Sequence, residues 1–340
     1  VLLYAASPLF NGKAPQEVIT ALVDKNGRQL LSSTYDESKW AKAAAAALDV
    51  IELGRYQLHV AYQRDYSSLA YPKTITPPDD NGTFHSNPWP NGWEDIDPFE
   101  SYRSLFDGSV NIYNNDELIF SRGLSQGSEN IEVMVIHQLP RSQGGGYNCH
   151  GMTQKQCDAY YMNNGEDCPG MNDMYEGKEG YTDPSRYNKD PRPAGVIEAK
   201  ELEDYPELGS KGAGVSRQYA HREPRFYASV GYNGSVWHML SANEKDNEEH
   251  DVQIFYYRGE SDGYQPGTYW LNTGIGIKKF VHPNDISDIG TGYNISRIEA
   301  KAAPDIRYAE VLLNYAEALN ELTTPYEIPS WNGEKVHTIK

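Results

Sequence analysis

Residues 305–321 read DIRYAEVLLNYAEALNE, and residues 40–58 read WAKAAAAALDVIELGRYQL. Apolar residues recur in both stretches at three- and four-residue spacing, which predicts amphipathic helices over about 38–53 and 303–322. The predicted apolar stripes are Trp40, Ala43, Ala44, Ala47, Leu48 and Ile51, then Ile306, Ala309, Leu312, Leu313, Ala316 and Leu319. Small side chains allow two helices to approach closely, so we expect these two to pack together.

Residues at the ends of these stretches support the two helices. Gly54 is well placed to end the first helix at C′, and Pro304 lies where a first helical turn tolerates proline. A shorter helix should end near residue 6, before Ser7-Pro8. Both long helices look like those of tetratricopeptide repeats, although no repeat of about 34 residues is visible. A discontinuous array with a large insertion would account for that.

The chain between the two long helices is irregular. Six prolines fall within residues 71–99, and residues 140–195 are rich in Gly, Asn, Asp and Tyr. A structureless loop this long is uncommon in a compact domain and is usually functional. Short apolar runs predict strands at 117–121, 131–137, 226–231, 252–258 and 275–281, and a helix is predicted over 102–114.

The predicted fold is mainly α, with tetratricopeptide-like helical pairs and a large loop-rich insertion that carries short strands. One domain should span residues 1–340, which is long enough to bury a large core. Within it, residues 1–70 and 300–325 form the helical part, and residues 71–299 form the insertion lobe. Because the chain begins inside an expected helix, with no initiator methionine or signal peptide, we expect a fragment cut at both ends.

The composition favours some ligand classes over others. The net charge of -18 repels phosphate backbones and anionic lipids, so we expect no binding to nucleic acid or directly to a membrane surface. Neutral ligands such as sugars remain. The chain has 26 Tyr against 8 Phe, and an excess of Tyr with Asn and Gly is typical of recognition loops. A loop-rich protein that uses Tyr as filler would have the same composition.

No residue pattern indicates a catalytic or metal site. Glycosidases need two carboxylates; the pairs Asp95/Asp97 and Glu166/Asp167 lie near aromatic residues, but chance produces such pairs among 48 acidic residues. The acidic stretch 243–251 lacks the spacing of a calcium loop. The histidines lack the spacing of a zinc site; they include His85, His137, His150, His221 and His238. We therefore predict no catalytic residue, no metal and no cofactor.

Three cysteines, Cys149, Cys157 and Cys168, fall within one 20-residue stretch. They allow one disulfide and one free thiol, or a clip that ties the loop. A disulfide between Cys149 and Cys157 would order the loop before a ligand binds and so lower the entropic cost of binding.

Aromatic loop residues are the best candidates for ligand binding. A pyranose ring has an apolar C–H face and polar edges, so a flat aromatic ring stacks on the face while polar groups bond the hydroxyls. The first candidates are Tyr147, Asn148, His150, Tyr160 and Tyr161, and the second are Trp89 and Trp93. The alternative for each ring is that it anchors its own long loop in the core.

Four segments together resemble the SusD/RagB family, the nutrient-binding partners of TonB-dependent transporters in Bacteroidetes-type bacteria. They are residues 1–12 (VLLYAASPLFNG), 40–58, 223–234 (EPRFYASVGYNG) and 305–321, in family order. Shorter matches lie at 118–122 (LIFSR), 173–175 and 274–283 (GIGIKKFVHP). Arg225 and Arg307 lie within these motifs beside acidic residues, and we expect both to form structural ion pairs.

The resemblance implies a non-catalytic receptor that captures an oligosaccharide or polysaccharide and delivers it to a SusC-like TonB-dependent transporter. It also implies a lipid-anchored protein on the extracellular face of the outer membrane; the lipid anchor itself is absent from this chain. Two alternatives stay open. A secreted glycan-active hydrolase would need two carboxylates that converge in an aromatic cleft, and a tetratricopeptide-type scaffold would bind a peptide or protein and bury its loop aromatics.

Overall fold

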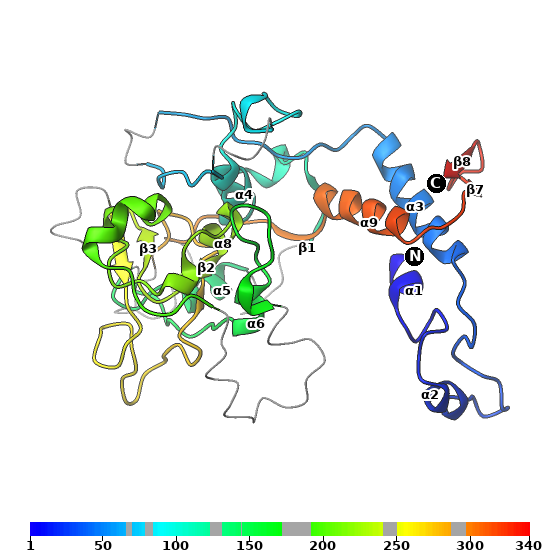
Figure 1. The fold of residues 1–340 in the computed structure, drawn as a ribbon, viewed down its shortest axis with the longest axis horizontal. Helices are drawn as coiled ribbons and strands as arrows, with labels where there is room; N and C mark the ends of the chain where they lie inside the picture. The colour runs from blue at the N-terminus through cyan, green and yellow to red at the C-terminus, as the bar shows by residue number, and fades with distance from the viewer. Residues whose placement is uncertain are drawn as a thin grey trace. The chain divides into compact units, whose positions relative to one another are not determined.

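The computed structural model describes residues 1–65, 70–78, 84–122, 131–143, 145–171, 192–240, 250–286 and 297–340. The chain forms two compact units (Figure 1). The first contains residues 1–58, 116–121 and 304–340, and the second contains residues 59–115 and 122–303. The fold is helical with short strands. The expectation of one domain with residues 71–299 as its insertion stays a prediction.

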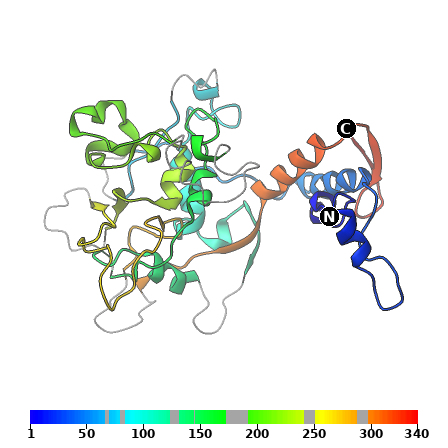
Figure 2. The ribbon, with the colours of Figure 1, turned by 60° about the horizontal axis from the view of Figure 1, so that its bottom comes forward.

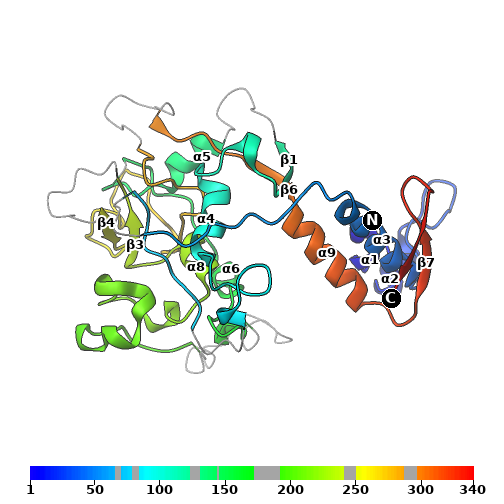
Figure 3. The same ribbon diagram turned by 90° about the horizontal axis from the view of Figure 1, so that it is seen from above.

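The core of the first unit lies between α3 (Ser38–Glu52), α9 (Tyr308–Asn320) and α1 (Leu2–Ala6). Figures 2 and 3 show α3 in blue beside α9 in orange. Buried residues of this core are Ala5, Trp40, Ala43, Ala44, Ala45, Ala318 and Ile339. Alanines on the facing side of α3 let the helices approach, so the expected packing of these two helices is confirmed. Whether they form tetratricopeptide-like pairs stays a prediction.

The other elements of the first unit are short. A helix, α2, spans Gln16–Ala21, and β7 (Tyr326–Pro329) pairs antiparallel with β8 (Val336–Ile339). Gly54 follows α3 with φ +60°, as its predicted C′ role requires. The β7–β8 hairpin contacts α3 and contributes Ile339 to the same core.

The last helix begins five residues later than predicted. Residues 303–307 form β6 (Ala303–Arg307), which pairs with β1 (Leu118–Arg122), so Pro304 lies in a strand. The predicted stripe is also wrong at Ile306, Leu313 and Ala316, which are exposed. The residues of α9 that meet the core include Leu319, which belongs to the predicted stripe, and Tyr315 and Ala318, which do not.

The described residues of the second unit form two apolar cores. The first gathers buried rings around α8 (Pro224–Ser229), which packs against α4 (Pro98–Asp107). The ring of Phe226 stacks on that of Tyr232 at 5.6 Å between centroids, and Tyr219 stacks on Tyr232 at 4.8 Å. The second core joins α5 (Ile131–Gln138) to β3 (Ser235–His238) and β4 (Asp251–Ile254), which pair antiparallel.

The remaining elements among the described residues of the second unit are one or two turns of helix or strands of two residues. They are η1 (Phe84–Ser86), η2 (Ile112–Asn114), α6 (Gln154–Asp158), η4 (Ala199–Asp204), η5 (Pro206–Lys211), η6 (Arg217–Tyr219), β2 (Val230–Gly231) and β5 (Gly276–Ile277). Strands β2 and β5 pair antiparallel. The strands predicted at 117–121, 252–258 and 275–281 are thus present as β1, β4 and β5, the last two in shorter form.

Two predicted strands are helices. Residues 131–137 lie in α5, where Val133, Val135 and Ile136 are all buried. A helix that is apolar on most sides shows no period of 3.6 residues, and its β-branched residues favour a strand by composition. Residues 226–231 lie mostly in α8, which begins at Pro224. The helix predicted over 102–114 is α4, which ends at Gly108 with φ +101°.

The side chain of Asp97 caps α4. Its Oδ1 accepts hydrogen bonds from the Glu100 N–H at 2.9 Å and the Thr74 hydroxyl at 2.5 Å. Its Oδ2 is buried and has no hydrogen-bond partner among the described residues. Burial, with a contribution from the nearby Glu100 charge, raises the pKa of Asp97 to about 6. At neutral pH the Asp97 carboxylate is ionised, and its burial therefore lowers the stability of the folded state.

We expect Asp97→Asn to keep the cap and to raise the melting temperature at pH 7.5. The folded-state pKa of about 6 lies above the unfolded value of 3.8. The ionised carboxylate therefore destabilises the fold above pH 6, by at most about 3 kcal/mol, and this cost disappears as the pH falls from 6 to 4. Thermal unfolding should show a smaller advantage of the variant at pH 4.5. An advantage that is equal at both pH values would contradict this account.

Candidate functional site

Residues 145–150 fold back along the end of α5. The Tyr147 N–H donates to the Ile136 carbonyl at 2.8 Å, and the Cys149 N–H donates to the His137 carbonyl at 2.9 Å. This pairing sets two predicted site residues against one ring of α5. The ring of His150 stacks on His137 at 5.0 Å and 13°, and the ring of Tyr147 meets His137 edge-on at 5.0 Å.

A distant loop supplies a fourth ring. Tyr269 lies with its ring 5.4 Å from that of Tyr147, at an interplanar angle of 31°. Its side chain is 63% exposed, whereas Tyr147 is half-buried. We call His137, Tyr147, His150 and Tyr269 the aromatic cluster. A half-buried ring that supports an exposed one is suited to stacking on an apolar ligand face.

The loop that carries Tyr269 is held by a buried carboxylate and a guanidinium. Asp262 is 3% exposed and accepts from the N–H groups of Arg141 at 2.6 Å and Ser142 at 3.2 Å. The Arg141 guanidinium donates to the carbonyls of Ser261 at 3.1 Å and Tyr269 at 2.7 Å. These bonds fix the exposed ring on an ordered backbone, so little entropy is lost when a ligand stacks on it.

The predicted site residue Asn148 belongs to this support. It is 3% exposed, with φ +49°, and its side-chain amide donates to the Asp262 carbonyl at 2.6 Å. The amide therefore holds the loop and is not exposed to bond a sugar. Asn tolerates this left-handed conformation better than most residues.

Tyr160 and Tyr161 are neighbours in the sequence but have different environments. The ring of Tyr160 packs on Phe226 at 5.9 Å, in the first core, and burial raises the pKa of its hydroxyl. Tyr161 is 45% exposed, and its N–H donates to the Glu223 carboxylate at 3.0 Å. Within the described part of the chain, no ring contact joins either residue to the aromatic cluster. The anchoring alternative therefore fits Tyr160 best.

Trp89 and Trp93 belong to the turn around residues 84–97, where both are half-buried. The Trp89 N–H donates to the Asp95 carboxylate at 2.7 Å, and the Trp93 ring lies 6.3 Å from that of His85. Their half-buried positions fit the anchoring of this turn. Asp95 here and Asp97 at the cap of α4 both accept backbone N–H groups, which gives this pair a structural role.

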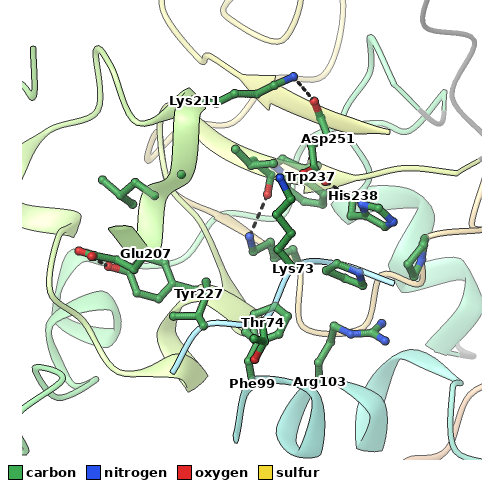
Figure 4. A pocket seen from close by; sticks show the side chains of 18 of the residues that line it. Lys73, Thr74, Phe99, Arg103, Glu207, Lys211, Tyr227, Trp237, His238 and Asp251 are labelled. Atoms are coloured by element: carbon green, nitrogen blue, oxygen red, sulfur yellow. Dashed lines mark hydrogen bonds and ion pairs between the residues drawn. The ribbon is translucent and has the colours of Figure 1, made fainter. Parts of the chain in front are cut away.

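A cavity of about 240 Å³ lies elsewhere in the second unit (Figure 4). Its walls come from residues 72–75, η5, α8, β3 and residues 278–283, and no sequence-predicted site residue lines it. Strands β3 and β4 place His238 opposite Asp251, with Nδ1 and Oδ1 2.7 Å apart. Lys278 donates from Nζ to the Val236 carbonyl at 3.1 Å, and burial lowers its pKa to about 8.

Comparison with known proteins gives the family. Residues 116–332, more than half of the chain, match the sequence model of the SusD family. The chain belongs to the SusD family. The expected resemblance is thereby confirmed, over a range that includes both the aromatic cluster and most of the cavity lining. No curated protein matches the chain.

Several solved structures align with the chain. The selenomethionine protein BT4246 aligns with a TM-score of 0.57 and 21% identity, over 93% of this chain and 50% of its own. A SusD-like protein (BF3747) from Bacteroides fragilis NCTC 9343 aligns at 0.44 and 19%, over 84% and 40%. A SusD-like carbohydrate binding protein (BF0978) from the same strain aligns at 0.43 and 18%, over 85% and 38%. This SusD-family chain thus spans half or less of the length of these proteins.

All three cysteines of this SusD-family chain are free, so the disulfide that the sequence allowed between Cys149 and Cys157 is not formed. Cys149 lies beside α5, whereas Cys157 lies in α6 and is buried in the first core. Burial raises the pKa of the Cys157 thiol to about 12, which leaves it almost wholly protonated and unreactive at neutral pH.

The ion pairs expected for two arginines exist but differ in burial. Arg307 pairs with Glu117, whose side chain is 3% exposed, as expected of a structural pair. Arg225 pairs with Glu223, but its own side chain is 48% exposed. A pair so exposed contributes little to stability. The fully buried arginine of this segment is Arg222, which the motif comparison did not single out.

Two further features bear on metal and membrane binding. Asp49, Glu52 and His337 of the first unit place ligand atoms within 4.8 Å of one another. Lys335 pairs with Glu52, and His337 pairs with Asp49 at 2.8 Å. These ion pairs account for the cluster without a metal ion. Among the described helices, none is sufficiently long and apolar to cross a membrane. The family-like residues 173–175 and the acidic residues 243–249 lie outside the described residues.

Proposed function

We propose that this chain is the glycan-binding part of a non-catalytic surface receptor. The receptor captures an oligosaccharide or polysaccharide and delivers it to a SusC-like TonB-dependent transporter, from a lipid-anchored position on the extracellular face of the outer membrane. Membership of the SusD family supports this proposal. The observation that carries it is the aromatic cluster, in which an exposed tyrosine is supported by a second ring and a bonded loop.

The cluster suits a sugar because it combines aromatic rings with polar groups. The Tyr269 ring offers a flat apolar face, and the imidazole of His150 and hydroxyl of Tyr147 offer polar atoms beside it. Such a surface recognises the C–H face of a pyranose and bonds its hydroxyls. Recognition of this kind needs no catalytic group, which agrees with the structural roles of Asp95 and Asp97.

We expect Tyr269→Ala to weaken oligosaccharide binding by about 5- to 150-fold, which is the loss of about 1–3 kcal/mol typical of an important contact ring. The melting temperature should stay within about 2 °C, because the side chain is largely exposed. Calorimetric titration with oligosaccharides cut from amylose, xylan and arabinan measures both the ligand preference and the loss.

The matched control is Tyr113→Ala, because Tyr113 is 91% exposed and lies on η2, outside the aromatic cluster. It should bind as wild type does. If Tyr269→Ala and Tyr113→Ala lose affinity equally, or neither does, the cluster is not the binding surface. Release of reducing ends during the same incubations would refute the non-catalytic part of the proposal. Co-purification of the tagged protein with an outer-membrane transporter from its host tests the proposed partner.

A further inference from the structure

A short antiparallel ribbon joins residues 161–163 to residues 221–223 in the second unit. The Asn163 N–H donates to the His221 carbonyl at 2.7 Å, and a second backbone bond of 3.1 Å runs from the Glu223 N–H back to residue 161. Residues 162 and 222 form the bridge between these two bonds. This register places residue 161 opposite residue 223, and residue 163 opposite residue 221.

The ribbon buries one of its side chains and exposes two rings. Arg222 is 2% exposed and bonds to carbonyls of the protein interior. Tyr161, by contrast, is 45% exposed, and the side chain of His221 is 48% exposed. The ring of His221 stacks on that of the half-buried Tyr205 at 5.1 Å and 28°. As in the aromatic cluster, a half-buried ring therefore supports an exposed one.

A fixed ion pair lies beside the exposed ring of Tyr161. One carboxylate oxygen of Glu223 accepts the Tyr161 N–H at 3.0 Å, and the other accepts the Arg225 Nε–H at 2.7 Å. The Glu223 side chain is 12% exposed, whereas that of Arg225 is 48% exposed. Within the part of the chain that the structure describes, Nη1 of Arg225 has no hydrogen-bond partner. The pair thus holds a guanidinium in place with donors left over for a ligand.

The chemistry of these groups favours a neutral ligand that carries hydroxyls. The charges of Glu223 and Arg225 cancel, so the pair does not select an ion. A hydroxyl both donates and accepts, so two neighbouring hydroxyls of a sugar can bond to the carboxylate and the guanidinium together. The Tyr161 ring can stack on the C–H face of the same sugar. Two residues along a strand span roughly 7 Å, so His221 lies within reach of a following sugar unit.

We propose that Tyr161, His221, Glu223 and Arg225 form a second sugar-binding surface, for a neutral oligosaccharide with neighbouring free hydroxyls. The choice of a sugar rests on the proposed glycan-binding function, whereas the preference for a neutral ligand with neighbouring hydroxyls rests on these four residues. Among the described residues, no ring contact joins this surface to the aromatic cluster. A substitution can therefore remove either surface alone.

Calorimetric titration with trisaccharides cut from amylose, xylan and arabinan tests the proposal. Wild type should bind two molecules of its preferred trisaccharide per chain, and Tyr269→Ala should bind one. Adding Tyr161→Ala or Arg225→Met to Tyr269→Ala should weaken the remaining binding at least fivefold. Adding His221→Asn should weaken it at least twofold; asparagine is chosen because the φ of His221 is +55°, which asparagine tolerates and alanine does not.

The matched control is Tyr62→Ala in the same Tyr269→Ala background. Tyr62 is 59% exposed and also lies at an antiparallel bridge, but outside both surfaces. It should change the remaining binding less than twofold. Since Tyr161 and Arg225 are each about half exposed, both variants should keep the melting temperature within about 2 °C. Should Tyr161→Ala nevertheless not fold, Arg225→Met decides the matter.

The outcomes separate this proposal from the general one. If wild type binds one trisaccharide per chain and Tyr269→Ala abolishes that binding, the second surface fails alone. Binding that remains in Tyr269→Ala and survives both Tyr161→Ala and Arg225→Met also overturns it, as does an equal loss in Tyr62→Ala. If no sugar binds at all, both proposals fail.

Discussion

Replacing Lys301 with methionine should lower the free energy of unfolding by about 3–5 kcal/mol, as expected when one member of a buried ion pair is lost. Lys301 and Asp285 lie 2.9 Å apart, and both side chains are fully buried. Lys301 also donates to the carbonyls of Asp107 at 2.8 Å and Glu299 at 3.0 Å. Without the lysine, the carboxylate of Asp285 is left buried without its counter-charge. Urea denaturation followed by circular dichroism measures the loss.

A double variant separates the lost pair from general damage. Asp285 accepts the N–H groups of His282 at 2.7 Å and Glu299 at 2.8 Å, and an asparagine keeps one of these acceptors. Lys301→Met with Asp285→Asn should therefore be more stable than the sum of the single changes predicts, by at least about 1 kcal/mol. Lys335→Met, at an exposed pair, is the control and should cost less than about 1 kcal/mol. Additive losses would contradict the buried-pair account.

Arg222→Ala should cost a similar amount, about 3–5 kcal/mol, because Arg222 is among the largest fully buried side chains. Its guanidinium donates to the carbonyls of Cys157 at 2.8 Å and Tyr160 at 2.6 Å. It also lies 4.4 Å from the ring centre of Phe226. The variant loses these bonds, leaves buried carbonyls without a donor and opens a cavity beside the first core.

Arg225→Ala is the matched control for Arg222→Ala. Both variants remove one arginine from the same segment, but Arg225 is 48% exposed and should cost less than about 1 kcal/mol. Arg222→Lys should lie between the two, since a lysine keeps the charge but not the forked geometry. Chemical denaturation of the three variants gives the order. Equal losses at Arg222 and Arg225 would mean that burial does not decide the effect.

Arg222 and Arg225 differ in whether neighbouring residues in the sequence predict their burial. The motif that contains Arg225 is visible in the sequence, and together with three other segments it indicated the SusD family. The burial of Arg222 depends on carbonyls more than 60 positions earlier in the chain. The adjacent residues do not indicate that contact. The motif therefore predicted burial of Arg225, whereas Arg222 is the buried arginine.

In the candidate site, too, some residues could be predicted from the sequence, but the contacts between them could not. Tyr147 and His150 are predictable from the composition of their loop, and the tyrosines within residues 256–269 carry a similar composition that would have indicated the second loop. The contact between Tyr147 and Tyr269 joins positions more than 100 residues apart, and the Arg141–Asp262 bonds that support it do so as well. The cavity has no local signature at all, because its lysines come from separate segments.

The amino-acid sequence by itself determined the two long helices of the first unit, the left-handed glycine after α3, and the family. The helices and the glycine rest on spacing within about 20 neighbouring residues, where the 3.6-residue period of a half-buried helix is visible. The family rests on four short motifs taken together. The tertiary structure alone decided that residues 131–138 form a helix, that the cysteines stay apart, and which rings are exposed. The physical reason is that burial on all sides erases periodicity, and contacts between distant segments leave no pattern in either one.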